Sequence, residues 1–144
     1  MFSPNSINIR SQQIPVYALV QGVREGRIVY GNYSYRVSQT SASKYIESLI
    51  LNIPSSPLYF DGTISPWRVI DGVKRLSCIL DFVNNSFPLR GLEYVGIYDH
   101  CPFSGLPPFI QSRLMNSPVH CYVVNPGTPT DVVDNIGKRI KSKL

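Results

Sequence analysis

The stretch that decides the fold is Trp67-Arg68-Val69-Ile70-Asp71-Gly72-Val73-Lys74-Arg75-Leu76. It predicts a short buried strand that runs directly into a helix, with Asp71-Gly72 at the joint. The first turn of a helix has unpaired backbone N–H groups and the positive end of the helix dipole. Gly72 would let a ligand approach the backbone, and Lys74 and Arg75 add positive charge, so the joint suits an anion such as a phosphate. A second interpretation stays open, in which Asp71 caps the helix, Gly72 eases the turn and both cations are solvated.

The composition is that of a folded domain. The chain has 144 residues, of which 43% are hydrophobic and 16% are charged. This is enough apolar material for one core, and it is unlike the composition of disordered chains. There is no run of eighteen apolar residues and no secretory pattern at the N-terminus, so we expect a cytoplasmic protein without a membrane partner.

The net charge of +5 is concentrated at one end of the chain. Four of the fourteen basic residues lie within 138–144, and the remaining ten nearly balance the nine acidic residues. We therefore expect a basic tail over 138–144, either solvated or in contact with nucleic acid. At the other end, residues 1–13 are polar and are expected to form an arm or an irregular first strand. The four basic residues of the expected tail are Lys138, Arg139, Lys141 and Lys143.

The cysteines indicate a reducing compartment. There are three, an odd number, so a disulfide framework is not expected. Two His-Cys dipeptides, His100-Cys101 and His120-Cys121, contain possible zinc ligands. Adjacent residues of a strand point to opposite faces, so such a pair does not easily donate both side chains to one metal. We expect no metal site.

The spacing of apolar residues predicts an α+β domain, a small mixed sheet with packed helices, formed by residues 1–144 as one unit. Gly22 weakens the first helix, because the same residues also fit a strand. Thr40 or Ser41 is expected to cap the second helix and Pro54 to end it. The expected helices cover 15–25, 41–53, 71–83, 107–115 and 128–140. The expected strands cover 27–30, 57–60, 67–70 and 119–124, with a further possible strand over 92–98.

Several segments together resemble the N-terminal domain of GmrSD-type modification-dependent restriction enzymes. The run Asp71-Gly72-Val73-Lys74-Arg75 is similar to the Asp-Gly-Gln-Gln-Arg signature of that family. The helix end over 46–54 is similar to the family's "I-E-S-L-L-L-G-I-P-I-P" segment. Weaker similarities occur over 87–92, at Leu106-Pro107 and over 136–140. The resemblance covers residues 14–141 and is most specific from Ile46 to Leu80.

The resemblance implies a ParB/sulfiredoxin-like fold whose strand–helix joint binds nucleotide phosphates. In the family, such domains hydrolyse a nucleoside triphosphate during anti-phage restriction. Gly72 would admit the phosphate to the backbone, and Arg75 would supply the counter-charge. Asp71, the candidate catalytic residue, would cap the helix or hold magnesium or water. The only cofactor that the resemblance suggests is therefore a nucleoside triphosphate with magnesium.

The sequence also departs from the family pattern. Val73 and Lys74 occupy the positions of the two signature glutamines, and Asn32-Tyr33 lies where the family has a Gln-Arg pair. Arg36 is close enough in sequence to replace that arginine as a phosphate contact. Groups that position water or stabilise phosphate charge act in the transition state, so losing them usually costs orders of magnitude in rate.

Three functions remain open from the sequence. The favoured one is a small non-catalytic or weakly catalytic binding module, of phage or mobile-element type, that docks on a partner protein or a nucleic-acid machine. Nine tyrosines, six phenylalanines and one tryptophan favour this interpretation, because aromatic residues are enriched at interfaces. The alternative is an NTP-hydrolysing module of a restriction system. The third is a ParB-like DNA contact through the basic tail and Lys44.

Overall fold

The computed structural model describes residues 3–31 and 37–142. Five strands form one mixed sheet in the order β1-β5-β3-β4-β2. The pairs β1–β5 and β3–β4 are antiparallel, whereas β3–β5 and β2–β4 are parallel. The predicted α+β class and mixed sheet are confirmed. The strands are β1 (Ile9–Pro15), β2 (Ile28–Val29), β3 (Leu58–Asp61), β4 (Trp67–Asp71) and β5 (Pro118–Val124).

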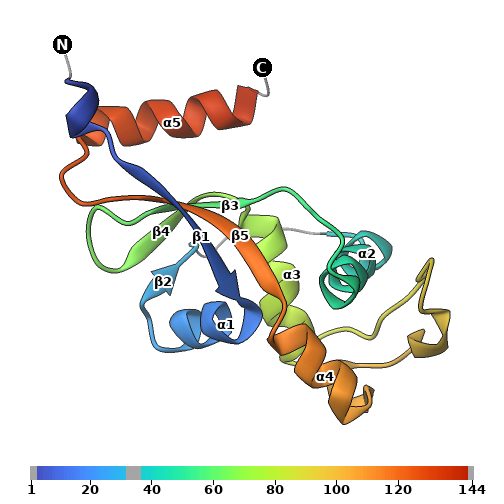
Figure 1. Ribbon diagram of the computed structural model, residues 1–144. Coiled ribbons are helices and arrows are strands. Elements are labelled where there is room, and N and C mark those ends of the chain that lie inside the picture. Colours follow the sequence, from blue (N-terminus) through green and yellow to red (C-terminus); the bar gives the residue numbers. More distant parts are fainter. Residues whose placement is uncertain (1–2, 32–36, 143–144) are drawn as a thin grey trace.

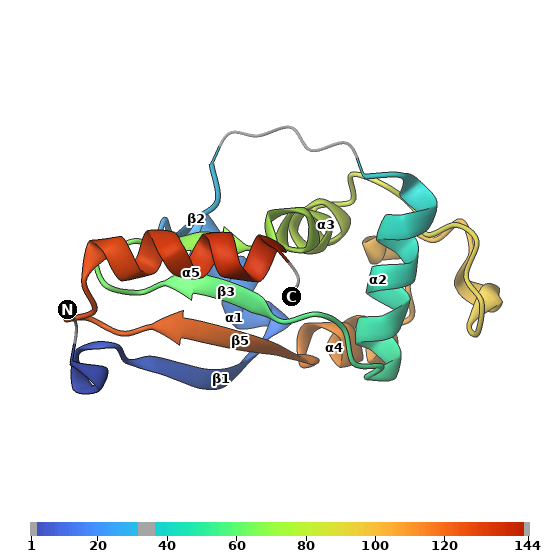
Figure 2. The same ribbon diagram turned by 90° about the horizontal axis from the view of Figure 1, so that it is seen from above.

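Helices cover the sheet unevenly. One helix, α5, crosses one face of the sheet, and the other four lie on the opposite face or beyond the end of the strands (Figures 1 and 2). The main core lies between the sheet and these four helices, around the fully buried side chains of Leu58, Phe60 and Leu76. The α-helices are α1 (Val16–Arg24), α2 (Gln39–Leu51), α3 (Val73–Val83), α4 (Pro108–Met115) and α5 (Thr130–Ser142). The 3-10 helices are η1 (Pro4–Ser6), η2 (Gly96–Tyr98) and η3 (Phe103–Gly105).

Residues 16–24 form the helix α1, although the sequence around Gly22 was also compatible with a strand. A Cβ atom at Gly22 would lie 2.8 Å from Cδ1 of Ile28, on β2. Gly22 therefore lets α1 approach the edge of the sheet, which compensates for its weak helix propensity.

The ends of α2 differ from the prediction. Ser38, rather than Thr40 or Ser41, is the N-cap, and its Oγ accepts a hydrogen bond from the Ser41 N–H. The helix ends at Leu51 and is capped by Asn52, whose φ of 57° is left-handed, so Pro54 does not end it. The Ile53 N–H then donates to the Ser48 carbonyl at 2.8 Å, as in a Schellman motif.

The prediction of a possible strand over 92–98 is wrong. Residues 89–101 form a closed loop whose ends are joined by two hydrogen bonds between Leu89 and residues His100 and Cys101. The backbone amides of residues 93–95 donate to the buried carboxylate of Glu47, on α2, and are thus unavailable to a sheet. We call residues 89–101 the projecting loop, because it extends away from the body of the protein (Figures 1 and 2).

The described parts of the two terminal regions belong largely to regular elements. Residues 9–13 belong to β1, so the strand alternative holds for them. At the other end, residues 138–142 are not a tail but the last turns of α5. The half-buried side chains of Ile136 and Ile140 face the sheet and hold the helix there, with its cations in the final turns.

Candidate functional site

Gly72 joins β4 to α3 in a conformation that favours glycine. Its φ is 105°, and an added Cβ would lie 2.4 Å from Cδ2 of the core residue Leu58. Gly72 is also the N-cap of α3. Because glycine has no side chain, the N-cap residue makes no side-chain hydrogen bond to the first amides of the helix. The expected Asp71 cap is therefore wrong, because Asp71 is the last residue of β4 and its carboxylate pairs with Arg75.

Arg75 ties the joint together. Its Nη2 lies 3.3 Å from Oδ2 of Asp71 and donates to the Pro57 carbonyl at 2.9 Å. Its Nε is buried and has no hydrogen-bond partner in the described part of the chain. Because Arg75 neutralises Asp71 and secures the segment that leads into β3, its first role is structural.

Two adjoining hollows follow the joint, and together we call them the joint groove. One, of about 220 Å³, is lined by residues 70–75 and Lys141. The other, of about 520 Å³, is lined by residues 29–31 and 68–70, together with Val73 and Lys141. Arg68, Lys74 and Lys141 contribute cationic side chains from three different elements, next to the start of α3.

The structure brings together some of the predicted site residues and separates others. Asp71, Gly72, Lys74 and Arg75 all line the joint groove, and Lys141 joins them from α5. Sequence reasoning missed Arg68, although its place in β4, three residues before Asp71, was a usable signal. Lys138 and Arg139, also on α5, are not among the residues that line the groove. Arg36 and Lys143 lie outside the described residues, as do Asn32 and Tyr33.

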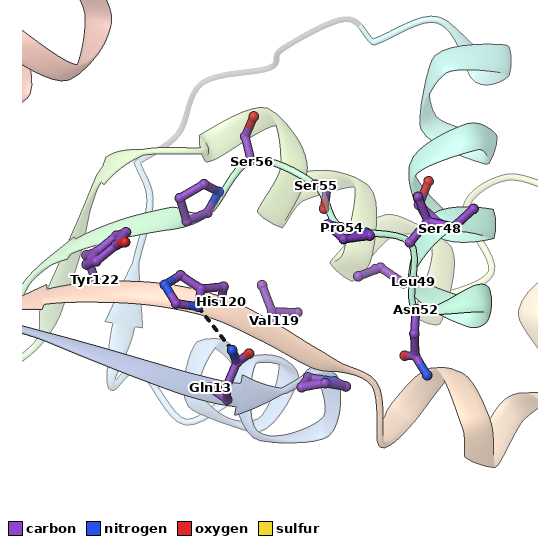
Figure 3. A pocket seen from close by; sticks show the side chains of 13 residues that line it. Gln13, Ser48, Leu49, Asn52, Pro54, Ser55, Ser56, Val119, His120 and Tyr122 are labelled. Carbon is purple, nitrogen blue, oxygen red and sulfur yellow. Dashed lines mark hydrogen bonds between the residues drawn. The ribbon is translucent and has the colours of Figure 1, made fainter.

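A separate hollow of about 440 Å³ lies between residues 48–57 and the strands β1 and β5 (Figure 3). None of the described residues that line it is aspartate, glutamate, lysine or arginine. His120 forms part of its wall, with Nδ1 3.0 Å from Nε2 of Gln13. The His120 ring packs edge-on against Tyr122, which in turn stacks on Tyr59. Sequence reasoning missed this hollow, because it combines residues from distant segments.

The cysteines and acidic residues do not gather into a metal centre. In residues 3–31 and 37–142, no group of three or more histidine, cysteine, aspartate or glutamate side chains could hold a metal ion. The three thiols are free, and burial raises the pKa of the Cys121 thiol to about 12. Among the same residues, no helix is both long and apolar enough to cross a membrane.

The comparisons with known proteins give no match. No family model fits the chain, and no curated protein or solved structure is significantly similar to it. The joint groove is therefore interpreted from its own residues and geometry.

Proposed function

We propose that the chain is a binding module on a ParB/sulfiredoxin-like scaffold, which holds the phosphate groups of a nucleotide in the joint groove. The observation that carries the proposal is that Lys74 and Lys141 line the hollow at the start of α3, and that Arg68 and Lys141 line the adjoining one. Amide N–H groups at a helix start and nearby cations both favour phosphate oxygens. A phosphate in the groove would contact the backbone N–H groups at the start of α3.

The same groove is poorly equipped for hydrolysis. Val73, at a position where the related signature has a glutamine, offers no side-chain hydrogen bond to a phosphate or to an attacking water. One oxygen of the Asp71 carboxylate is paired with Arg75 at 3.3 Å, so that oxygen is not free to position an attacking water. Since phosphoryl transfer depends on positioning and charge stabilisation, we expect binding with little or no turnover.

The proposal is tested by titrating the protein with ATP and with GTP, with and without magnesium, by calorimetry, and by measuring phosphate release. We expect saturable binding that Lys141→Ala weakens about tenfold, because one charge-assisted contact is lost. Lys44→Ala is the matched control, since Lys44 pairs with Glu93 and is not among the residues that line the groove.

Two results would contradict the proposal. One is the absence of nucleotide binding, and the other is binding that Lys141→Ala and Lys44→Ala weaken equally. Turnover at rates typical of nucleoside triphosphatases, abolished by Arg75→Ala in a folded protein, would instead support the NTP-hydrolysing alternative.

Docking on a partner protein is a second candidate function, favoured by the projecting loop. Tyr94 and Ile97 near its tip are 69% and 85% exposed, although the buried Glu47 fixes the backbone beneath them. A preordered loop that presents apolar side chains binds with a reduced entropic cost. We expect Ile97→Asp to abolish capture of a partner that binds the wild-type chain, whereas Ile64→Asp, at a 59% exposed isoleucine between β3 and β4, leaves it unchanged.

A further inference from the structure

The first strand has an open edge. β1 is the outermost strand of the sheet, and β5 is its neighbour on the inner side (Figure 2). No other described strand pairs with it. Four of its seven residues are exposed, and Ile9 retains 42% of its accessible surface. A strand edge of this length is a template for pairing with another strand.

The register shows which backbone groups are available. The Asn125 N–H donates to the Asn8 carbonyl, and the Val16 N–H donates to the Ser117 carbonyl, at the two ends of the β1–β5 ladder. In an antiparallel ladder, every second residue directs both of its backbone groups to the same neighbour. The even-numbered residues of β1 therefore face β5, and Ile9, Ser11 and Gln13 direct their N–H and C=O groups to the open edge.

The usual protection of an edge strand is missing here. Natural edges are often guarded by an outward lysine, a central proline or a bulge. The cation of β1, Arg10, is turned toward its own sheet, where it donates to Asn125 and lies over the Trp67 ring at 5.3 Å. Pro15 stands at the end of the strand and leaves the N–H groups of Ile9, Ser11 and Gln13 available.

We infer that β1 pairs with β1 of a second copy of this chain, antiparallel and about a two-fold axis at Ser11. Ile9 then exchanges backbone hydrogen bonds with Gln13 of the other copy, and Ser11 exchanges them with its equivalent. Arg10 lies opposite the neutral Gln12, whose Oε1 already accepts from Arg10 within one chain at 3.2 Å. The small Ser11 side chains meet at the axis, and the two sheets become continuous.

The neighbouring registers are less favourable. An axis at Arg10 places two guanidinium groups directly opposite each other, and like charges there are destabilising. An axis at Gln12 places Ile9 opposite Pro15, which has no N–H to donate. Only the register centred on Ser11 joins all three outward residues without a repelled charge or a lost donor, and this self-complementarity favours a second copy over an unrelated peptide.

Analytical ultracentrifugation over a range of protein concentrations tests the inference on the full chain. We expect a reversible monomer–dimer equilibrium. Ser11→Pro removes an outward N–H from both copies while sparing the β5 ladder, and should weaken dimerisation by about thirtyfold. Ser11→Lys places two charges at the axis and should weaken it at least as much. Ser86→Lys, in an exposed bend after α3, is the matched charge control and should leave the equilibrium unchanged.

A second measurement fixes the register. Arg10 and Gln12 of the two copies form a non-hydrogen-bonded pair, in which the Cα atoms are about 4.5 Å apart. A mixed sample of labelled and unlabelled protein should therefore show an intermolecular nuclear Overhauser effect between their Hα protons. A monomer at all concentrations, a dimer unaffected by both Ser11 variants, or intermolecular contacts without this pair would overturn the inference.

Discussion

Glu47 is expected to hold the projecting loop in place. Its side chain is 3% exposed and accepts hydrogen bonds from three successive backbone amides, at 3.1, 2.9 and 3.0 Å. Burial raises the pKa of Glu47, but the three backbone hydrogen bonds outweigh burial, and the net pKa lies below its ordinary value. The carboxylate is thus the form that the fold stabilises.

The cost of Glu47→Gln follows from this geometry. One carboxylate oxygen accepts from the amide of residue 93, and the other accepts from the amides of residues 94 and 95. A glutamine keeps one acceptor oxygen and places an NH₂ group against at least one amide donor. A lost hydrogen bond to a charged group costs about 1.5–3 kcal/mol, so we expect a loss of about 2–3 kcal/mol in the free energy of unfolding.

Urea unfolding and amide hydrogen exchange measure this effect together. We expect Glu47→Gln to lower the unfolding midpoint and to speed exchange at residues 93–95, with little change in the amides of the β1–β5 ladder. Glu93→Gln is the matched control, since it removes the partner of an exposed ion pair with Lys44 and should behave like wild type. If Glu47→Gln leaves both stability and exchange unchanged, Glu47 does not hold the loop.

The pH dependence provides an independent check on the same residue. Because the folded-state pKa of Glu47 is lowered, its contribution is fully present above the unfolded pKa and is lost as the pH falls through the folded pKa. Wild type should therefore lose more stability than Glu47→Gln on acidification below about pH 4.5. Parallel stability curves for the two proteins would contradict this assignment.

Two further predictions concern the joint and the thiols. Gly72→Ala should cost about 2 kcal/mol or more, because it adds a clash with Leu58 to the strain of a positive φ, whereas Gly127→Ala, with φ of 94° and open space around it, should cost only about 1 kcal/mol. Thermal unfolding of both variants separates the clash from the strain. Burial raises the pKa of Cys78 to about 11 and that of Cys121 to about 12, so at pH 8 iodoacetamide should label the half-buried Cys101 first. Mass spectrometry of the labelled protein would contradict this if Cys121 reacted as quickly.

Local patterns predicted the regular elements well, because their causes lie within a few residues. The helix expected over 41–53 and the strand expected over 119–124 correspond to α2 and β5, within about two residues at each end. The possible strand over 92–98 failed for a reason that no local pattern carries. The backbone amides of residues 93–95 donate to the carboxylate of Glu47, which lies on α2, 46 or more residues earlier in the chain.

The candidate site was only partly predictable for the same physical reason. Asp71 and Gly72 are adjacent in sequence, so the joint between strand and helix could be predicted. The Asp71 carboxylate pairs with Arg75, one turn later, instead of capping the helix, and the sequence alone did not indicate which of the two it would do. Lys141 was predicted to lie in a tail. It reaches the joint groove because the apolar face of α5 packs on the sheet, which fixes the helix end beside α3.

Gly72 and Arg75 are required by packing at the joint even without a ligand. Leu58 leaves no room for a side chain at Gly72, and Arg75 is held by Asp71 and the Pro57 carbonyl. These contacts give both residues a role in stabilising the structure, so their presence alone is not evidence for phosphate binding. The cation that distinguishes a structural role from a phosphate-binding role is Lys141, which lines both hollows of the groove and belongs to α5. Arg75→Ala should lower stability and binding together, whereas Lys141→Ala should lower binding alone, and equal stability losses in the two variants would remove the basis for a ligand at this joint.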